Sequence, residues 1–143
     1  MKDKVADVIK LGDHGTTFGG GPLQTAVAHH VVSRIVEPAF LPQVRSLADT
    51  LAARLKELPG LFPRLVAGAP RGRGLIQGLP FTREEYAARV VKLCRERGLL
   101  LLSCGKATVR FVPSLIVTEA EIEKCVDVLE SVLVVLNREA EGL

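Results

Sequence analysis

Residues 12–22 limit the possible folds more than any other stretch, because five of these eleven residues are glycine and the last is Pro22. So much glycine excludes a regular helix or strand, and proline fits the first turn of a helix, so a helix is predicted to start there. Small side chains let a backbone approach a ligand closely, and the hydroxyls of Thr16 and Thr17 beside a helix start favour an anion such as phosphate. A loop that needs glycine only for its backbone angles is the alternative, and spacing alone leaves both open.

Apolar periodicity predicts two helices after this loop. The first covers residues 23–37, where Pro38 interrupts the pattern. The second covers residues 42–58 and is expected to end at Pro59, with charged residues off its apolar side. The apolar stripe of this second helix consists of Val44, Leu47, Leu51 and Leu55.

The second half of the chain alternates short β-like runs with helices. Two runs separated by a turn rich in glycine, proline and arginine predict a hairpin. The predicted elements are strands 61–67 and 74–80, a helix from Thr82 to Gly98 with a capping box between Thr82 and Glu85, a buried strand 99–102, a strand 107–112 and a last helix that starts with a capping box between Thr118 and Glu121. The predicted fold class is therefore α/β, with a small antiparallel or mixed sheet covered on one face by helices.

Composition and charge argue against several classes of partner and site. The net charge of +3 comes from 19 basic and 16 acidic residues spread over all predicted elements, so no nucleic-acid partner is expected. No apolar run approaches the roughly 20 residues of a membrane span, and residues 1–10 predict a short amphipathic helix rather than a signal or transit peptide. Cys94, Cys104 and Cys125 form no Cys-x-x-Cys pair and lack histidines at metal-binding spacing, so neither disulfides nor a metal site is expected. Cys94 and Cys125 are predicted to pack in the core.

The glycine-rich loop resembles a motif of one enzyme family. Residues 13–22, Asp-His-Gly-Thr-Thr-Phe-Gly-Gly-Gly-Pro, are similar to the His-Gly-(Ser/Thr)-Thr-Phe-Gly-Gly-Asn-Pro loop of class III pyridoxal-phosphate-dependent aminotransferases. The resemblance implies that Thr17 binds the phosphate of a cofactor held by the neighbouring subunit of a homodimer, and that Thr16 contacts the substrate. Gly21 replaces the family's usual asparagine, which removes a hydrogen-bonding side chain but keeps a permissive backbone beside Pro22.

Two further segments extend the resemblance. Residues 71–78 are similar to the family's Arg-Gly-x-Gly-Leu-x-x-Gly strand, although Arg71 and Arg73 by themselves are expected as solvated turn residues without a catalytic role. Residues 108–118 resemble its Arg-(Phe/Ile)-x-Pro-(Pro/Ser)-Leu signature. Arg110 lies within an apolar strand, so it either faces solvent or meets a carboxylate. The matching arginine of related enzymes lies at the active site, where its fork suits a glutamate or a substrate carboxylate.

The resemblance also implies a domain organisation and a cofactor. Residues 1–40 correspond to the end of the large cofactor-binding domain, with the threonine loop and an interdomain helix, and residues 41–143 to the small C-terminal domain of a fold-type I enzyme. The cofactor is then pyridoxal 5'-phosphate. Its lysine is expected in a segment upstream of this chain, so no catalytic residue is expected here, and Lys106 is not that lysine.

Within the family, residues 101–113 resemble fungal acetylornithine enzymes most, which transfer an amino group between N2-acetyl-L-ornithine and 2-oxoglutarate. The expected partners are small amino acids and 2-oxo acids, and the expected compartment is the mitochondrial matrix for a fungal source and the cytoplasm otherwise. Ornithine and 4-aminobutyrate aminotransferases, an aminomutase and a non-catalytic fragment are the alternatives. A fragment would expose apolar sides of the first two helices that normally pack on the large domain.

Overall fold

The computed structural model describes residues 7–8, 10, 12–13 and 15–142. The helix predicted over residues 1–10 lies for the most part outside the described residues, as does His14. The chain divides into two compact units, Met1–Leu41 and Pro42–Leu143, and each is described by itself. Among the described residues, no helix combines the length and apolar content that crossing a membrane requires.

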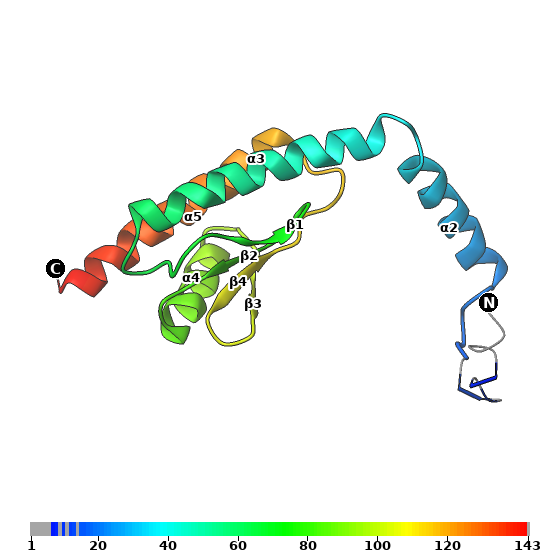
Figure 1. Ribbon diagram of the computed structural model, residues 1–143, viewed down its shortest axis with the longest axis horizontal. Helices are drawn as coiled ribbons and strands as arrows, with labels where there is room; N and C mark the ends of the chain where they lie inside the picture. Colours follow the sequence, from blue (N-terminus) through cyan, green and yellow to red (C-terminus); the bar gives the residue numbers. More distant parts are fainter. Residues whose placement is uncertain (1–6, 9, 11, 14, 143) are drawn as a thin grey trace. The chain divides into compact units, whose positions relative to one another are not determined.

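The first unit contains the glycine-rich loop and helix α2, which spans Pro22–Ile35 (Figure 1). The helix begins as predicted, since Pro22 occupies its first turn and Gly21 is the N-cap residue. None of its residues is buried, and its leucine and most of its valines are exposed, namely Leu23, Val27, Val31 and Val32. Leu23 is 72% exposed, which agrees with the prediction that this helix has an apolar side in need of a partner.

Helix α3 spans Phe40–Leu61 and is longer than predicted at both ends. Its predicted stop at Pro59 is wrong, because this proline lies in the last turn and the helical pairing continues past it. The N–H of Phe62 still donates to the carbonyl of Leu58 at 2.8 Å, so only the bond that Pro59 cannot donate is missing. The apolar stripe is confirmed, with Leu51 and Leu55 buried in the core. The expectation that this side of the helix would be exposed without the large domain is therefore wrong, because the second unit's own core covers it.

Four short strands form one antiparallel sheet in the order β1-β2-β4-β3. Their bounds are Arg71–Arg73 for β1, Ile76–Pro80 for β2, Leu102–Cys104 for β3 and Thr108–Phe111 for β4 (Figure 1). The predicted α/β class with an antiparallel sheet and helices is confirmed, and so is the order of elements along the chain.

The predicted hairpin has a different first strand. Residues 61–67 form the end of α3, a turn and a single bridge from Val66 to Phe81 rather than a strand. The N–H of Val66 pairs locally with the carbonyl of Phe62 at 2.9 Å, and only the N–H of Ala67 reaches across to the carbonyl of Pro80, at 2.9 Å. The strand that pairs with β2 is Arg71–Arg73, in the segment predicted to be the turn. The side-chain amide of Gln77, which is buried, closes this hairpin by donating to the carbonyl of Gly74 at 2.8 Å.

Two helices complete the second unit and supply much of its core. Helix α4 spans Glu84–Glu96 and contacts β3 and β4, and helix α5 spans Glu119–Glu141 and contacts α4. Core side chains from α3, the sheet, α4 and α5 form one cluster. The fully buried members include Leu51, Leu55, Leu58, Leu65, Leu79, Val90, Cys94, Val109, Leu129, Val132 and Leu133.

The two predicted capping boxes have different outcomes. The box at Thr118 is confirmed, because its hydroxyl accepts from the N–H of Glu121 at 3.3 Å and the Glu121 carboxylate accepts from the N–H of Thr118 at 2.8 Å. The box at Thr82 is wrong. That hydroxyl instead donates to the carbonyl of Arg64 at 2.7 Å, so Arg83 becomes the N-cap residue without a side-chain hydrogen bond. A tertiary partner 18 residues away has displaced the local one.

The strand predicted at residues 99–102 is shifted and is not buried. Strand β3 starts at Leu102, and all three of its residues are exposed. Leu100 is 80% exposed and Leu102 is 60% exposed. The continuous apolar run predicted burial, but β3 is an edge strand of the sheet and no element of this unit covers its outer side.

Candidate functional site

In the glycine-rich loop, the hydroxyl of Thr16 accepts a hydrogen bond within the loop, whereas that of Thr17 has no hydrogen-bond partner among the described residues. Gly19 donates its N–H to the Thr16 hydroxyl at 3.2 Å, which folds the loop back on itself. A side chain at Gly19 would collide with that of Thr16, so this close approach requires glycine. The Thr17 side chain is exposed, and among the described residues no hydrogen bond occupies its hydroxyl.

The start of α2 adds a favourable environment for an anion beside Thr17. The first turn of this helix contains no acidic residue, so nothing there opposes the positive end of the helix dipole. The first N–H groups of any helix lack partners within the helix. Gly21 is the N-cap residue without a side-chain cap, where the family's asparagine could supply one. The loop therefore fits a phosphate through Thr17 and the backbone.

In the second unit, the sheet has one face buried by helices and one open face. The buried face carries Leu79, Val109 and Phe111. On the open face, register places Arg71 opposite Gly78, and Gly78 opposite Arg110. We call this row of three residues from adjacent strands the arginine row.

A hollow of about 400 Å³ lies on this open face. Gly78 is one of its lining residues. A Cβ at this position would approach Thr108 Cγ2 to 3.1 Å, which is a tight contact. The arginines of the row line the hollow from two different strands, and the turn after β3 borders it. The lining residues are Arg71, Gly72, Ile76, Gln77, Gly78, Cys104, Gly105, Thr108 and Arg110.

Arg110 lies where the strand pattern predicted, and of its two predicted environments it has the solvent-facing one. Its side chain is exposed, and no carboxylate pairs with it among the described residues. Arg71 is exposed, as predicted, but it lies on strand β1 rather than in a turn. Segments 71–80 and 102–112, which supply all four strands, contain no acidic residue.

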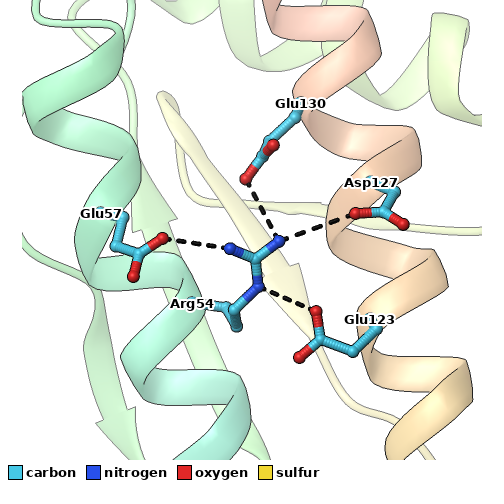
Figure 2. Close-up of polar contacts among 5 residues, drawn as sticks. All are labelled: Arg54, Glu57, Glu123, Asp127 and Glu130. Carbon is cyan, nitrogen blue, oxygen red and sulfur yellow. Dashed lines mark hydrogen bonds and ion pairs between the residues drawn. The ribbon is translucent and has the colours of Figure 1, made fainter.

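A contrasting arginine lies between α3 and α5. Figure 2 shows Arg54 of α3 surrounded by four carboxylates. Its Nε donates to Glu123 at 2.9 Å and its Nη1 to Glu57 at 3.1 Å, while Nη2 lies 3.5 Å from Glu130 and 3.6 Å from Asp127. Desolvation by itself lowers the pKa of Arg54, but the hydrogen bond and charge of Glu123, with the charges of Glu130 and Glu57, raise it overall. Arg54 is thus a structural cation that joins two helices.

Cys94 is buried and Cys125 is partly buried against the core, whereas Cys104 is exposed. Burial, reinforced by neighbouring Cys125, raises the pKa of Cys94 to about 11 despite Arg97. Burial likewise raises the pKa of Cys125 to about 11. Both thiols are therefore protonated near neutral pH, and the predicted packing role of Cys94 is confirmed by its complete burial. The described residues contain no cluster of three or more side chains suited to a metal ion.

A cavity in the second unit is lined by few side chains that could take part in chemistry. It has a volume of about 480 Å³ and lies between α3, the segment before β3 and the start of α5. Its lining is mostly aliphatic, and Ser114 and Glu121 are its polar side chains. The predicted site residues Thr16, Thr17 and Arg110 are not among the residues that line this cavity.

The second unit is thus an α/β domain whose open sheet face carries Arg71 and Arg110, and the first unit supplies a glycine-rich loop at the start of α2. The class III aminotransferase family matches residues 1–133, and the chain belongs to this family. The solved structure of a lysine aminotransferase from M. tuberculosis is 30% identical in sequence to this chain and superposes on it with a TM-score of 0.80. The match covers 93% of this chain and 31% of that one.

Two curated relatives are fungal enzymes. The mitochondrial acetylornithine aminotransferase of Neurospora crassa is 44% identical over 130 residues, which are 91% of this chain and 28% of that protein. The corresponding enzyme of Saccharomyces cerevisiae is 40% identical over 133 residues, which are 93% of this chain and 31% of that protein. The chain thus spans less than a third of the length of either relative.

Proposed function

We propose that this chain is the C-terminal part of an acetylornithine aminotransferase, which transfers an amino group between N2-acetyl-L-ornithine and 2-oxoglutarate. The observation that carries the proposal is the free Thr17 hydroxyl in a loop of the family motif, at a helix start without acidic residues. The 44% identity to the Neurospora crassa enzyme supports the choice of substrate. Residues 1–40 would then end the large domain, and residues 41–143 would form the small one.

The cofactor of this proposal is pyridoxal 5'-phosphate, and Thr17 would hold its phosphate. A hydroxyl and unpaired backbone N–H groups at the start of α2 suit a dianionic phosphate. In a homodimer this loop would reach the cofactor of the neighbouring subunit. When bound, the cofactor supplies an electron sink for the reaction, and its lysine would come from outside residues 1–143.

The remaining site residues would handle the substrate. Thr16 matches the position of the family loop that contacts the amino-acid substrate, so its side chain would contact that substrate here. Arg110 is exposed on the open sheet face without a carboxylate partner among the described residues, which leaves its guanidinium free for a substrate carboxylate. A guanidinium can bind a carboxylate through two parallel hydrogen bonds and so fix its orientation.

A chimera tests the proposed reaction. This chain would replace the 133 aligned residues of the Saccharomyces cerevisiae enzyme, and amino transfer from N2-acetylornithine to 2-oxoglutarate would be measured. We expect activity within about tenfold of the parent enzyme. A folded, cofactor-loaded chimera without amino transfer would contradict the proposal.

The same chimera tests the role of Thr17. Thr17→Ala should weaken cofactor retention by roughly 0.5–3 kcal/mol, the contribution of one hydrogen bond including those to charged groups. Thr17→Ser keeps the hydroxyl and is the matched control. Equal cofactor affinity of the alanine variant and the unchanged chimera would remove this assignment.

Other amino donors are tested by substrate comparison. The likeness to the lysine aminotransferase of M. tuberculosis makes lysine a second candidate donor, beside ornithine and 4-aminobutyrate. We expect the highest kcat/KM with N2-acetylornithine. Amino transfer without added 2-oxoglutarate would instead indicate an aminomutase, and a chimera inactive with every donor would favour a non-catalytic fragment.

The mitochondrial names of the fungal relatives support a mitochondrial location of the complete enzyme, which imaging of the tagged full-length product would test.

A further inference from the structure

The side chain of Gln24 occupies the space that Gly21 leaves empty at the start of α2. Gln24 is the third residue of this helix, and Gly21 is its N-cap residue. A Cβ placed on Gly21 would lie 2.5 Å from Oε1 of Gln24 and 3.5 Å from its Cδ. The Gln24 side chain therefore folds back toward the helix start, and it can hold this position only because residue 21 has no side chain.

The amide of Gln24 lies where the family loop has an amide of its own. Asparagine, the family's usual residue at position 21, carries its amide directly on Cβ, and the Gln24 amide contacts that same point here. A separation of 2.5 Å is too short for a carbon and an oxygen that are not bonded, so the two side chains exclude each other. This chain has thus lost an amide at position 21 and has regained one from position 24.

The hydrogen-bonding capacity of the Gln24 amide is unused within the described residues. The next side chain, that of Thr25, donates its hydroxyl to the carbonyl of Gly21 at 3.0 Å, but no such bond involves the two donors of the Gln24 amide. The first residue of the helix is Pro22, which has no N–H and leaves the helix start one backbone donor short. A side-chain amide at this place can supply the missing donor.

We propose that Gln24 binds the cofactor phosphate together with Thr17, and that its amide takes the place of the N-cap side chain that this chain lacks. This inference rests on the proposed function, because the phosphate is that of the cofactor held by the loop. A neutral amide suits this position, since it donates N–H groups to phosphate oxygens and adds no negative charge beside them.

The test uses the chimera with the Saccharomyces cerevisiae enzyme, loaded with pyridoxal phosphate. Two measurements report on the phosphate without amino transfer, namely the dissociation constant of the cofactor from equilibrium dialysis and the phosphorus NMR shift of the bound phosphate. Gln24→Met keeps the length of the side chain and removes its amide. We expect this variant to bind the cofactor about three- to tenfold more weakly and to shift the phosphorus signal.

Gln24→Glu separates phosphate binding from helix capping. Glutamate is favoured at the third position of a helix and its charge suits the helix dipole, so a purely structural role predicts unchanged or tighter cofactor binding. Phosphate binding predicts a loss of at least about tenfold, because a carboxylate cannot donate and repels the phosphate. Gln43→Ala is the matched control, since Gln43 is an exposed glutamine close behind Pro42 near the start of α3. Circular dichroism would verify that each variant is folded.

The mutual exclusion of side chains 21 and 24 gives the most specific test. In Gln24→Ala, adding Gly21→Asn should restore cofactor affinity to within about twofold of the unchanged chimera, because the asparagine amide fills the vacated space. With Gln24 in place, Gly21→Asn should bring no gain, since both amides compete for one position. Additive effects of the two substitutions would overturn this exchange.

Unchanged cofactor affinity in Gln24→Met, unchanged or tighter binding in Gln24→Glu, or an equal loss in Gln43→Ala would also overturn the inference. These results differ from failure of the proposed function. If an active chimera loses cofactor in Thr17→Ala but not in the Gln24 variants, only the role of Gln24 is wrong. If the loaded chimera transfers no amino group, yet loses cofactor in Gln24→Ala and regains it with Gly21→Asn, the phosphate contact stands and the proposed reaction fails.

Discussion

Arg54 and the arginine row lie in the same unit of the chain, and they show two opposite uses of a guanidinium. Arg54 is surrounded by four carboxylates from α3 and α5, and its exposed side-chain fraction is 27%. Arg71 and Arg110 lie on an open sheet face where the strand segments contain no acidic residue. The partners of Arg54 within the fold mark it as structural, whereas Arg71 and Arg110 are exposed and form no ion pair among the described residues.

The largest expected effect is the loss of stability when a core leucine of α3 is shortened. It measures how far the packing of α3 depends on apolar contact rather than on the ion pairs of Arg54. Leu55 follows Arg54 in sequence and is fully buried. Leu55→Ala should destabilise the chain by roughly 2–5 kcal/mol, because it removes core contacts and leaves a cavity. Urea unfolding followed by circular dichroism would measure the loss. Leu100→Ala, at a position that is 80% exposed, is the control and should change stability little.

A pair of arginine variants tests the comparison directly. Arg54→Ala should lower the urea midpoint, because four carboxylates would face one another without their shared cation, and added salt should reduce this loss. Arg110→Ala should leave stability within about 0.5 kcal/mol of the unchanged chain. Arg45→Ala, at an exposed position of α3, controls for loss of charge alone. A larger loss in Arg110→Ala than in Arg54→Ala would reverse the two assignments.

The start of α5 positions the helix that carries three of the four carboxylates around Arg54. Thr118→Ala removes the capping box and should cost about 0.5–2 kcal/mol, whereas Thr118→Ser should keep most of that stability.

The capping box also has a pH dependence, which Thr118→Ala should remove. Backbone and side-chain hydrogen bonds from Thr118 lower the pKa of Glu121 below its ordinary value of 4.5. The contribution is therefore present above pH 4.5 and is lost as pH falls through the lowered folded-state pKa. Identical acid unfolding of the two proteins would contradict this account.

A further effect lies in alkaline solution and concerns the core on the far side of the sheet from the arginine row. Burial raises the pKa of Cys94 from 9.0 to about 11, so its contribution to stability is present below pH 9 and is lost as pH rises through about 11. Stability between pH 9 and 11 should fall less steeply in Cys94→Ala than in the unchanged chain. Cys104→Ala, at an exposed position, should keep the original slope.

Much of the fold was predictable because its signals are local. The periodicity of α3 and α5, the capping box at Thr118 and the class of the sheet all follow from residues close in sequence. The errors arose where a distant partner changed a local preference. Thr82 donates to the carbonyl of Arg64 instead of capping α4, and an arginine-rich segment pairs with β2 instead of forming a turn.

The sites were predictable to a different degree. Thr16, Thr17 and Arg110 came from short motifs, and the family membership that those motifs indicated is confirmed over residues 1–133. Their individual roles stay predictions. That Arg71 shares a sheet face with Arg110 could not be predicted from the sequence, because neighbours in the chain say nothing about which side of a sheet a residue faces or what lies opposite.

The sequence by itself determined the family, the glycine-rich loop that ends at Pro22 and the helices with their apolar stripes, since each depends on residue types at short and fixed spacing. Only the tertiary structure decided which arginines are structural and which remain exposed without an ion pair among the described residues. The reason is that the partner of a charge is set by strand register and helix packing. These bring Arg54 to Glu123, 69 residues further along the chain, and place Arg71 and Arg110 on either side of one glycine.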